Sequence, residues 1–127
     1  MVVDDDRVMV SLLTMLLQME GFEVMAPEPG KSIAEQALAD RPDLVLMDVL
    51  MARADGIDIL DQLRSNSDLM SLRVIMSSGM DVEEKCREHG ADAFLLKPYT
   101  PDQLIQIIRA KLGSGGGPAA SAPLGES

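Results

Sequence analysis

The sequence is poor in three features that would each point to a particular class of protein. It has one cysteine, Cys86, which excludes an internal disulfide and suits a reducing compartment, so we expect a cytoplasmic protein. No apolar run reaches the roughly eighteen residues of a membrane helix, and no signal segment opens the chain. Basic residues are scarce, with 11 Lys and Arg against 21 Asp and Glu and a net charge of -10. We therefore expect no direct contact with nucleic acid or a membrane.

The chain alternates between short apolar runs and longer helical stretches. Its 127 residues fit one domain with a substantial core. The alternation is typical of repeated strand-helix units around a parallel sheet, and we predict five strands and five helices in an α/β fold. Four strands are continuous apolar runs, as expected where helices cover both faces, whereas residues 22–25 alternate and predict an edge strand. The strands are expected at residues 1–3, 22–25, 44–47, 74–76 and 94–96.

Capping residues mark where the helices begin and end. Ser32 with Glu35 forms one capping box, and Thr100 with Gln103 forms another. Gly21 is the expected stop of the first helix. The helices are predicted over residues 7–20, from 32, over 56–64, over 81–89 and from 100. From residue 113 the chain is rich in Gly, Ser, Pro and Ala, which predicts a domain over residues 1–112 and a flexible linker or tail over 113–127.

Polar residues follow four of the predicted strands. Asp4 and Asp5 come after the first strand, Asp48 directly follows the run 44–47, Ser77 follows 74–76, and Lys97 follows 94–96. In an open α/β sheet, ligands bind beyond the carboxyl ends of the strands, so these groups should converge. Clustered carboxylates repel each other unless a hard cation neutralises them, which predicts Mg²⁺. A carboxylate beside a metal and a lysine can accept a phosphoryl group.

The motifs around these residues resemble those of a response-regulator receiver domain, the phosphoacceptor module of two-component signalling. They are V-V-D-D-D at the start, D-x-x-x-x-x-x-D-G from Asp48 to Gly56, I-M-S-S-G around Ser77, and G-A-D-A-F-L-L-K-P-Y from Gly90 to Tyr99. The resemblance covers residues 1 to about 112. It implies a doubly wound, flavodoxin-like sheet of five parallel strands in the order 2-1-3-4-5, with helices on both faces.

The resemblance also implies a metal site and a phosphodonor. Asp48 would accept a phosphoryl group from a histidine kinase or phosphotransfer protein. Asp5 would bind Mg²⁺ directly and Asp4 through water, with Asp48 and the backbone carbonyl of Leu50 as further ligands. Asp6, by contrast, is expected to place its charge at the start of the first helix. An output domain or a separate partner protein would respond to the modification.

The same resemblance assigns a conformational switch to the neighbouring strands. Lys97 would pair with the phosphoryl group, and Ser77 would turn inward to hydrogen-bond it. Phe94 would change rotamer as Ser77 moves. The peptide bond between Lys97 and Pro98 would be cis, which is uncommon elsewhere.

The sequence departs from the family pattern in the first strand and around the acceptor. Only residues 1–3 precede the acidic pair, so the first strand looks short. Ala52 stands where the family usually has proline, and Leu50 and Gly79 lack polar side chains that could orient a water. Residues 7–19 hold nine apolar residues, which indicates either deep packing or a partner-docking surface.

Two other functions compete with the receiver interpretation. One is a receiver-like interaction domain that is never phosphorylated, which the short first strand keeps open. The other is a Mg²⁺-dependent phosphatase of the haloacid-dehalogenase type, in which residues 4–6 would be a D-x-D motif. The chain is short for such a phosphatase, and no acidic pair follows Lys97. The predicted protein is thus a self-modifying switch and not a turnover enzyme.

Overall fold

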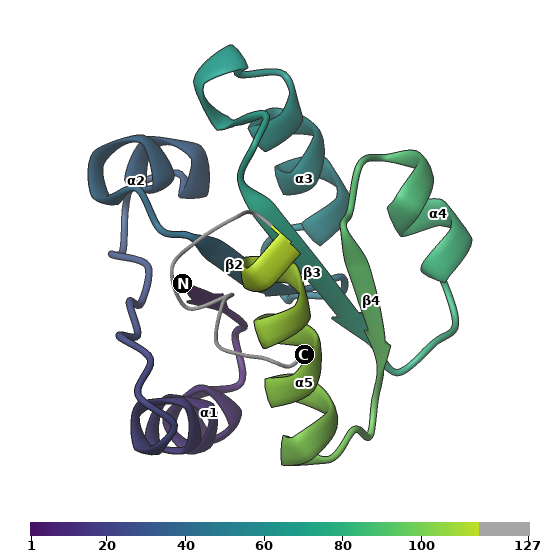
Figure 1. Ribbon diagram of the computed structural model, residues 1–127. Helices are drawn as coiled ribbons and strands as arrows, with labels where there is room; N and C mark the ends of the chain where they lie inside the picture. Colours follow the sequence, from purple (N-terminus) through teal and green to yellow (C-terminus); the bar gives the residue numbers. More distant parts are fainter. Residues whose placement is uncertain (115–127) are drawn as a thin grey trace.

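The computed structural model describes residues 1–114, which form a parallel sheet covered by helices (Figure 1). Among these residues the sheet has four strands in the order β1-β2-β3-β4, and all three neighbouring pairs are parallel. The strands are β1 (Val2–Val3), β2 (Leu44–Asp48), β3 (Arg73–Ser78) and β4 (Ala93–Leu96). Because the strands are parallel, their carboxyl ends all lie at the same end of the sheet, which we call its carboxyl edge.

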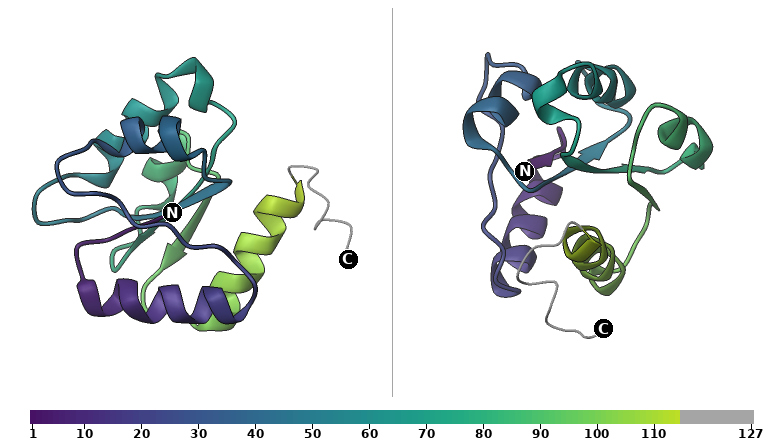
Figure 2. Two further views of the ribbon diagram at one scale, coloured as in Figure 1. Left: turned by 90° about the vertical axis from the view of Figure 1, so that its left-hand side faces the viewer. Right: turned by 45° about the horizontal axis from the view of Figure 1, so that its top comes forward.

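Helices lie on both faces of the sheet, as the sequence predicted (Figure 2). Successive residues of β2 alternate between the faces: Val45 and Met47 belong to one buried cluster, and Leu44 and Leu46 to another. The first cluster includes residues of α2, α3 and α4, and the second includes residues of α1 and α5. The helices are α1 (Arg7–Met19), α2 (Ile33–Asp40), α3 (Gly56–Arg64), α4 (Glu83–Glu88) and α5 (Pro101–Ser114), with a 3₁₀ helix, η1 (Ser67–Leu69).

The predicted fifth strand, at the edge, is wrong. Residues 22–25 run beside β1 and are joined to it by a backbone hydrogen bond from the Val2 amide to the Met25 carbonyl at 3.1 Å, but they form no strand. Because β1 has two residues and already pairs with β2 along its other side, it offers too few backbone groups for a second ladder. Phe22 and Val24 are partly buried and Glu23 is exposed, so the alternation reported burial and not strand pairing. The four observed strands keep the predicted order.

The helix boundaries follow the capping residues. Asp6 is the N-cap of α1 and accepts hydrogen bonds from the amides of Val8 and Met9, both at 3.1 Å. Ser32 and Glu35 form the predicted capping box of α2. Thr100 and Gln103 exchange the equivalent pair of bonds before α5. Gly21 and Gly90, which follow α1 and α4, have φ of 92° and 105°, a left-handed region that favours glycine.

Two predicted boundaries need correction. The helix predicted over residues 81–89 is shorter, since α4 spans Glu83–Glu88. α5 spans Pro101–Ser114, two residues past the predicted end of the domain at residue 112. Residues 115–127 of that predicted tail lie outside the described residues. Within the described range, no helix has both the length and the apolar character needed to cross a membrane.

α1 buries only one of its two apolar faces. Leu13 and Leu17 pack into the core beneath the helix. The apolar stripe on the opposite side of α1 is open to solvent, so deep packing alone does not explain why this helix is so apolar. Its large apolar side chains and their exposed fractions are Val8 71%, Leu12 53%, Met15 61% and Met19 78%.

Candidate functional site

The carboxyl edge of the sheet brings together the acidic residues that the sequence singled out. Asp4 and Asp5 follow β1, and Asp48 is the last residue of β2. Each offers one carboxylate oxygen, and these three atoms lie within 4.8 Å of one another. Asp6, which caps α1, is outside this cluster, as its predicted helix role requires.

Lys97, just beyond β4, places its ammonium group between two of these carboxylates. Its Nζ lies 3.2 Å from Oδ1 of Asp48 and 3.4 Å from Oδ2 of Asp4. The Asp48 side chain is 11% exposed and that of Lys97 is 25% exposed. The Lys97 amide also donates to the Ser78 carbonyl at 2.8 Å, which holds this segment against the end of β3. The peptide bond from Lys97 to Pro98 is cis.

The surroundings shift the pKa of both central groups. Burial raises the pKa of Asp48, and the hydrogen bond and positive charge of Lys97 offset only part of that rise. Burial alone would lower the pKa of Lys97, but the hydrogen bond that Lys97 donates to Asp48 and the charges of Asp4 and Asp48 outweigh it and raise that pKa. Lys97 therefore stays charged at neutral pH. The cluster contains three carboxylates and one ammonium group, so it still attracts a cation.

The donor set of the cluster fits a hard divalent cation. Carboxylate oxygens are ligands that Mg²⁺ prefers, and Mg²⁺ usually keeps several waters, for which exposed Asp5 leaves room. One Asp5 oxygen also accepts a hydrogen bond from the Ala52 amide, which ties the loop after β2 to the cluster. Leu50 lies in that loop with its side chain 61% exposed, and it bridges to Asp55.

Gly56 allows this loop to close, and the sequence reasoning missed that role. Its amide donates to the Val49 carbonyl at 2.8 Å, so the start of α3 lies directly against the end of β2. A Cβ added to Gly56 would collide with the carbonyl oxygen of Asp48. The sequence places Gly56 in the D-x-x-x-x-x-x-D-G motif and at the start of a helix, but its contact with the Asp48 carbonyl exists only in the folded chain.

Ser77 and Phe94 occupy neighbouring strands beside the cluster. Ser77 pairs with Asp48 in the β2–β3 register and is 2% exposed. Phe94 pairs with Met76 on the other side of β3 and is partly buried against the core. Ser77 is therefore one strand away from Asp48, and Phe94 is two strands away. The movements predicted for their side chains stay predictions.

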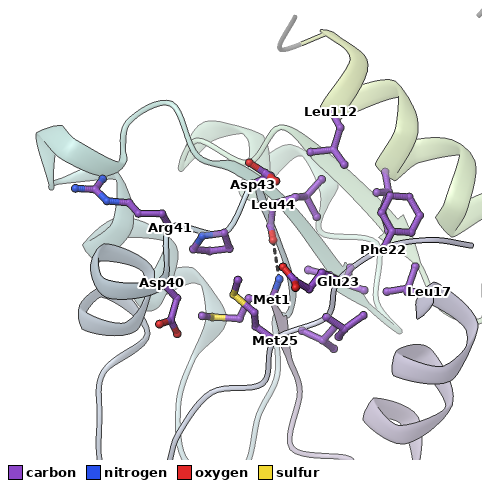
Figure 3. A pocket seen from close by; sticks show the side chains of 15 residues that line it. Met1, Leu17, Phe22, Glu23, Met25, Asp40, Arg41, Asp43, Leu44 and Leu112 are labelled. Atoms are coloured by element: carbon purple, nitrogen blue, oxygen red, sulfur yellow. Dashed lines mark hydrogen bonds between the residues drawn. The ribbon is translucent and has the colours of Figure 1, made fainter. Parts of the chain in front are cut away.

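A separate cavity of about 310 Å³ lies at the opposite end of β1 and β2 (Figure 3). Leu44, Phe22 and Leu112 line it, and the Met1 amine donates to the Leu44 carbonyl at 2.8 Å there. Leu44 begins β2, whereas Asp48 ends it. This cavity contains none of the acidic residues of the cluster, so the candidate site is the open edge of the sheet.

Known proteins with similar sequences and structures place this arrangement in one family. The family model described as "Response regulator receiver domain" matches residues 1–109. The transcriptional regulatory protein CpxR of Klebsiella pneumoniae is 40% identical over 116 residues, which cover 88% of this chain and 48% of CpxR. The response regulator MprA of Mycolicibacterium vanbaalenii is 34% identical over 114 residues, with 88% and 49% covered. The chain thus spans about half the length of these curated relatives.

Solved structures agree with the sequence matches. A putative response regulator from Chloroflexus aurantiacus superposes with a TM-score of 0.80 at 27% identity, covering 87% of this chain and 93% of that one. The receiver domain of NtrX from Brucella abortus gives a TM-score of 0.72 at 31% identity, covering 87% and 95%. The family match, the fold and the acidic edge lead to one conclusion: this chain belongs to the response regulator receiver domains of two-component signalling.

Proposed function

We propose that Asp48 is the phosphoacceptor of this receiver domain and that its modification switches the domain between two signalling states. The observation that carries this proposal is the position of Asp48. Its largely buried carboxylate ends a central strand, lies near the carboxylates of Asp4 and Asp5, and has the Lys97 ammonium 3.2 Å away. A nucleophile, a divalent-cation site and a fixed cation are the parts that phosphoryl transfer requires.

The proposed reaction is a direct displacement at phosphorus. A carboxylate oxygen of Asp48 forms the new O–P bond, while the P–N bond of a donor phosphohistidine breaks and its electron pair returns to the imidazole. Mg²⁺, held by Asp5, by Asp4 through water, by Asp48 and by the Leu50 carbonyl, would neutralise charge on the phosphoryl oxygens. Lys97 would pair with the same oxygens from the β4 side, where its Nζ already lies between two carboxylates.

The proposed switch follows from the strand neighbours of Asp48. The Ser77 hydroxyl would turn toward the phosphoryl group, because Ser77 is the register partner of Asp48 on β3. Phe94 would then change rotamer on β4, one strand further along. The charge added at Asp48 would in this way change the conformation of a side chain on β4, the outermost strand on that side of the sheet.

The partners of the whole protein are part of this proposal. A histidine kinase or a phosphotransfer protein would supply the phosphoryl group. The curated relatives are about twice as long as the region they share with this chain, which supports an output domain or a separate output partner. Receiver domains are signalling proteins and not conventional enzymes, so the chain would catalyse only its own phosphorylation and dephosphorylation.

Intact mass spectrometry after exposure to a small phosphodonor, with and without Mg²⁺, tests the proposal. We expect one phosphoryl group per chain, dependent on Mg²⁺ and absent from Asp48→Asn. Asp58→Asn, at an exposed position on α3, is the matched control and should label like the wild type. Full labelling of Asp48→Asn would exclude Asp48 as the acceptor. An unlabelled wild type would support the interaction domain, and steady release of phosphate from an external ester would support the phosphatase.

A further inference from the structure

A hollow of about 710 Å³ opens beside the acidic cluster. Asp4 and Asp5 belong to its lining, and so do residues 51–54 of the loop after β2. The segment over residues 27–33, which leads into α2, and Arg7 at the start of α1 also line it. Its volume is in the range of small-molecule sites. A ligand in this hollow would therefore lie next to the proposed metal site.

Two arginines of the hollow have no partner in the folded chain. Arg7 and Arg53 are exposed, and neither forms a hydrogen bond or ion pair with any residue that the structure describes. Lys31, the third basic residue of the hollow, is paired with Glu28 at 3.4 Å. Acidic residues outnumber basic ones by 21 to 11, so an arginine in this chain has many possible partners. Two unpaired guanidinium groups in one hollow thus point to a ligand with negative charge.

Hydrogen bonds hold both loops of the hollow in place. Gln36 is 2% exposed, and its Nε2 donates to the carbonyls of Glu28 and Lys31, both at 3.4 Å. The Gln36 Oε1 accepts from the Glu28 amide. On the other loop, the Ala52 amide donates to the Asp5 carboxylate, one residue before the free arginine at position 53. The backbone of the hollow is therefore fixed before a ligand arrives, which lowers the entropic cost of binding.

The charges around the hollow favour a phosphate dianion. A chain of net charge -10 repels such an ion over most of its surface. Mg²⁺ on the cluster would cancel the charges of Asp4 and Asp5, and Arg7 and Arg53 would then leave the hollow locally positive. The planar guanidinium group also matches phosphate oxygens with paired hydrogen bonds. A small phosphate compound therefore fits both the charge and the position of this hollow.

We propose that Arg7 and Arg53 capture small acyl phosphates in this hollow and hold them beside the metal before transfer to Asp48. This inference rests on the proposed function, because it takes Asp48 as the acceptor. In the transfer, a carboxylate oxygen of Asp48 forms the new O–P bond. The P–O bond to the acyl group breaks, and the carboxylate that leaves keeps its electron pair. The two arginines bind the donor and take no part in bond formation.

Labelling with acetyl phosphate in Mg²⁺ buffer, followed by intact mass spectrometry, tests the capture. At low donor concentration, the double variant Arg7→Gln with Arg53→Gln should label about tenfold more slowly than the wild type. The double variant Lys85→Gln with Arg87→Gln, at exposed positions on α4, makes the same change in net charge and is the matched control. Equal rates in the two double variants would overturn the proposal.

Binding of inorganic phosphate separates the capture from the transfer, because free phosphate is no donor. In NMR spectra of the ¹⁵N-labelled wild type with Mg²⁺, phosphate should shift the amide signals of residues 28–32 and 52–54. The shifts should be lost in the arginine double variant and kept in the control. Shifts that persist in the arginine variant would contradict the capture site. If the wild type binds phosphate there but acetyl phosphate does not label it, the capture stands and the acceptor role of Asp48 fails.

Discussion

Charges are balanced at the amino end of the sheet and unbalanced at its carboxyl end. At the amino end, the Arg64 guanidinium donates to the Leu72 carbonyl at 2.7 Å, to the Gly90 carbonyl at 2.9 Å and to the Asp92 carboxylate at 2.9 Å. Asp92 also accepts from the Val74 amide at 2.8 Å. One cation thus meets one carboxylate, and the backbone groups around them are paired. At the carboxyl end, the Lys97 ammonium pairs with the carboxylates of Asp4 and Asp48, and the carboxylate of Asp5 adds a third negative charge to the cluster.

The difference separates a charge-balanced ion pair from a cluster that keeps excess negative charge. The pair of Arg64 and Asp92 joins α3 to the start of β4, and its charges balance without any added ligand. The cluster at the other edge keeps excess negative charge and a raised pKa at Asp48, so folding alone does not satisfy it. Incomplete compensation of this kind is common where a site must bind something. Removing a charged side chain should therefore destabilise the fold at the amino end and stabilise it at the carboxyl end.

The largest effect is expected at the amino end. Arg64→Leu should lower the free energy of unfolding by about 3 kcal/mol, because the Asp92 carboxylate loses its cation and the Leu72 and Gly90 carbonyls lose a donor. Urea unfolding measures the change. Arg87→Leu is the control, since Arg87 pairs with Glu83 at a site where both side chains are about half exposed, and its loss should cost less than about 1 kcal/mol. Equal losses would contradict the structural role of Arg64.

Mg²⁺ should have the next largest effect, at the carboxyl end. With a dissociation constant of about 1 mM, 10 mM Mg²⁺ should add roughly 1.4 kcal/mol to the free energy of unfolding by binding only the folded chain. Thermal unfolding in MgCl₂ measures this, with NaCl at matched ionic strength as the control. The gain should shrink in Asp48→Asn, which loses one carboxylate ligand. An equal shift in NaCl would remove the metal site from the proposal.

Asp48→Asn itself should stabilise the fold at pH 7 without Mg²⁺, by about 1 kcal/mol, the size of a typical stabilising substitution. Burial raises the pKa of Asp48 above its ordinary 3.8, so its contribution to stability is present below that pH and is lost as pH rises through the raised pKa. The asparagine variant avoids this loss. Its advantage in urea unfolding should therefore fade below about pH 4, and an advantage that persists there would rule out this cause.

The sequence predicted those parts of the structure that depend on local or periodic signals. The capping boxes at Ser32 and Thr100 act within four residues, and the apolar runs report burial on both faces. Parallel strands place their ends along one edge, so the convergence of Asp4, Asp5, Asp48 and Lys97 followed from topology.

What the sequence did not predict depends on backbone contacts between distant segments. Residues 22–25 have the alternation of a strand, but pairing depends on how many groups β1 offers. The requirement for glycine at position 56 comes from the Asp48 carbonyl, which lies beside it only after folding. Arg64 likewise donates hydrogen bonds to Leu72, Gly90 and Asp92, and no regular spacing in the sequence relates these residues to it.

The smallest effect on stability is expected from polar replacements beside Asp48. Leu50 is 61% exposed, and a Cβ added at Gly79 meets nothing within 4 Å. Leu50→Asn and Gly79→Glu should therefore each change the free energy of unfolding by less than about 0.5 kcal/mol. Their effect should instead be on the lifetime of the phosphoryl group. Hydrolysis needs a water in line with phosphorus, and a polar side chain can orient that water, whereas Leu50 can exclude it.

We therefore expect the phosphorylated wild type to be long-lived and both variants to lose the phosphoryl group faster. Intact mass spectrometry over time in Mg²⁺ buffer measures the rates, and Leu50→Met, which keeps the position apolar, controls for any change at that site. If the polar variants hydrolyse no faster than Leu50→Met, these two positions do not set the lifetime. If the polar variants also unfold more easily by several kcal/mol, the carboxyl edge is less tolerant than its open space indicates.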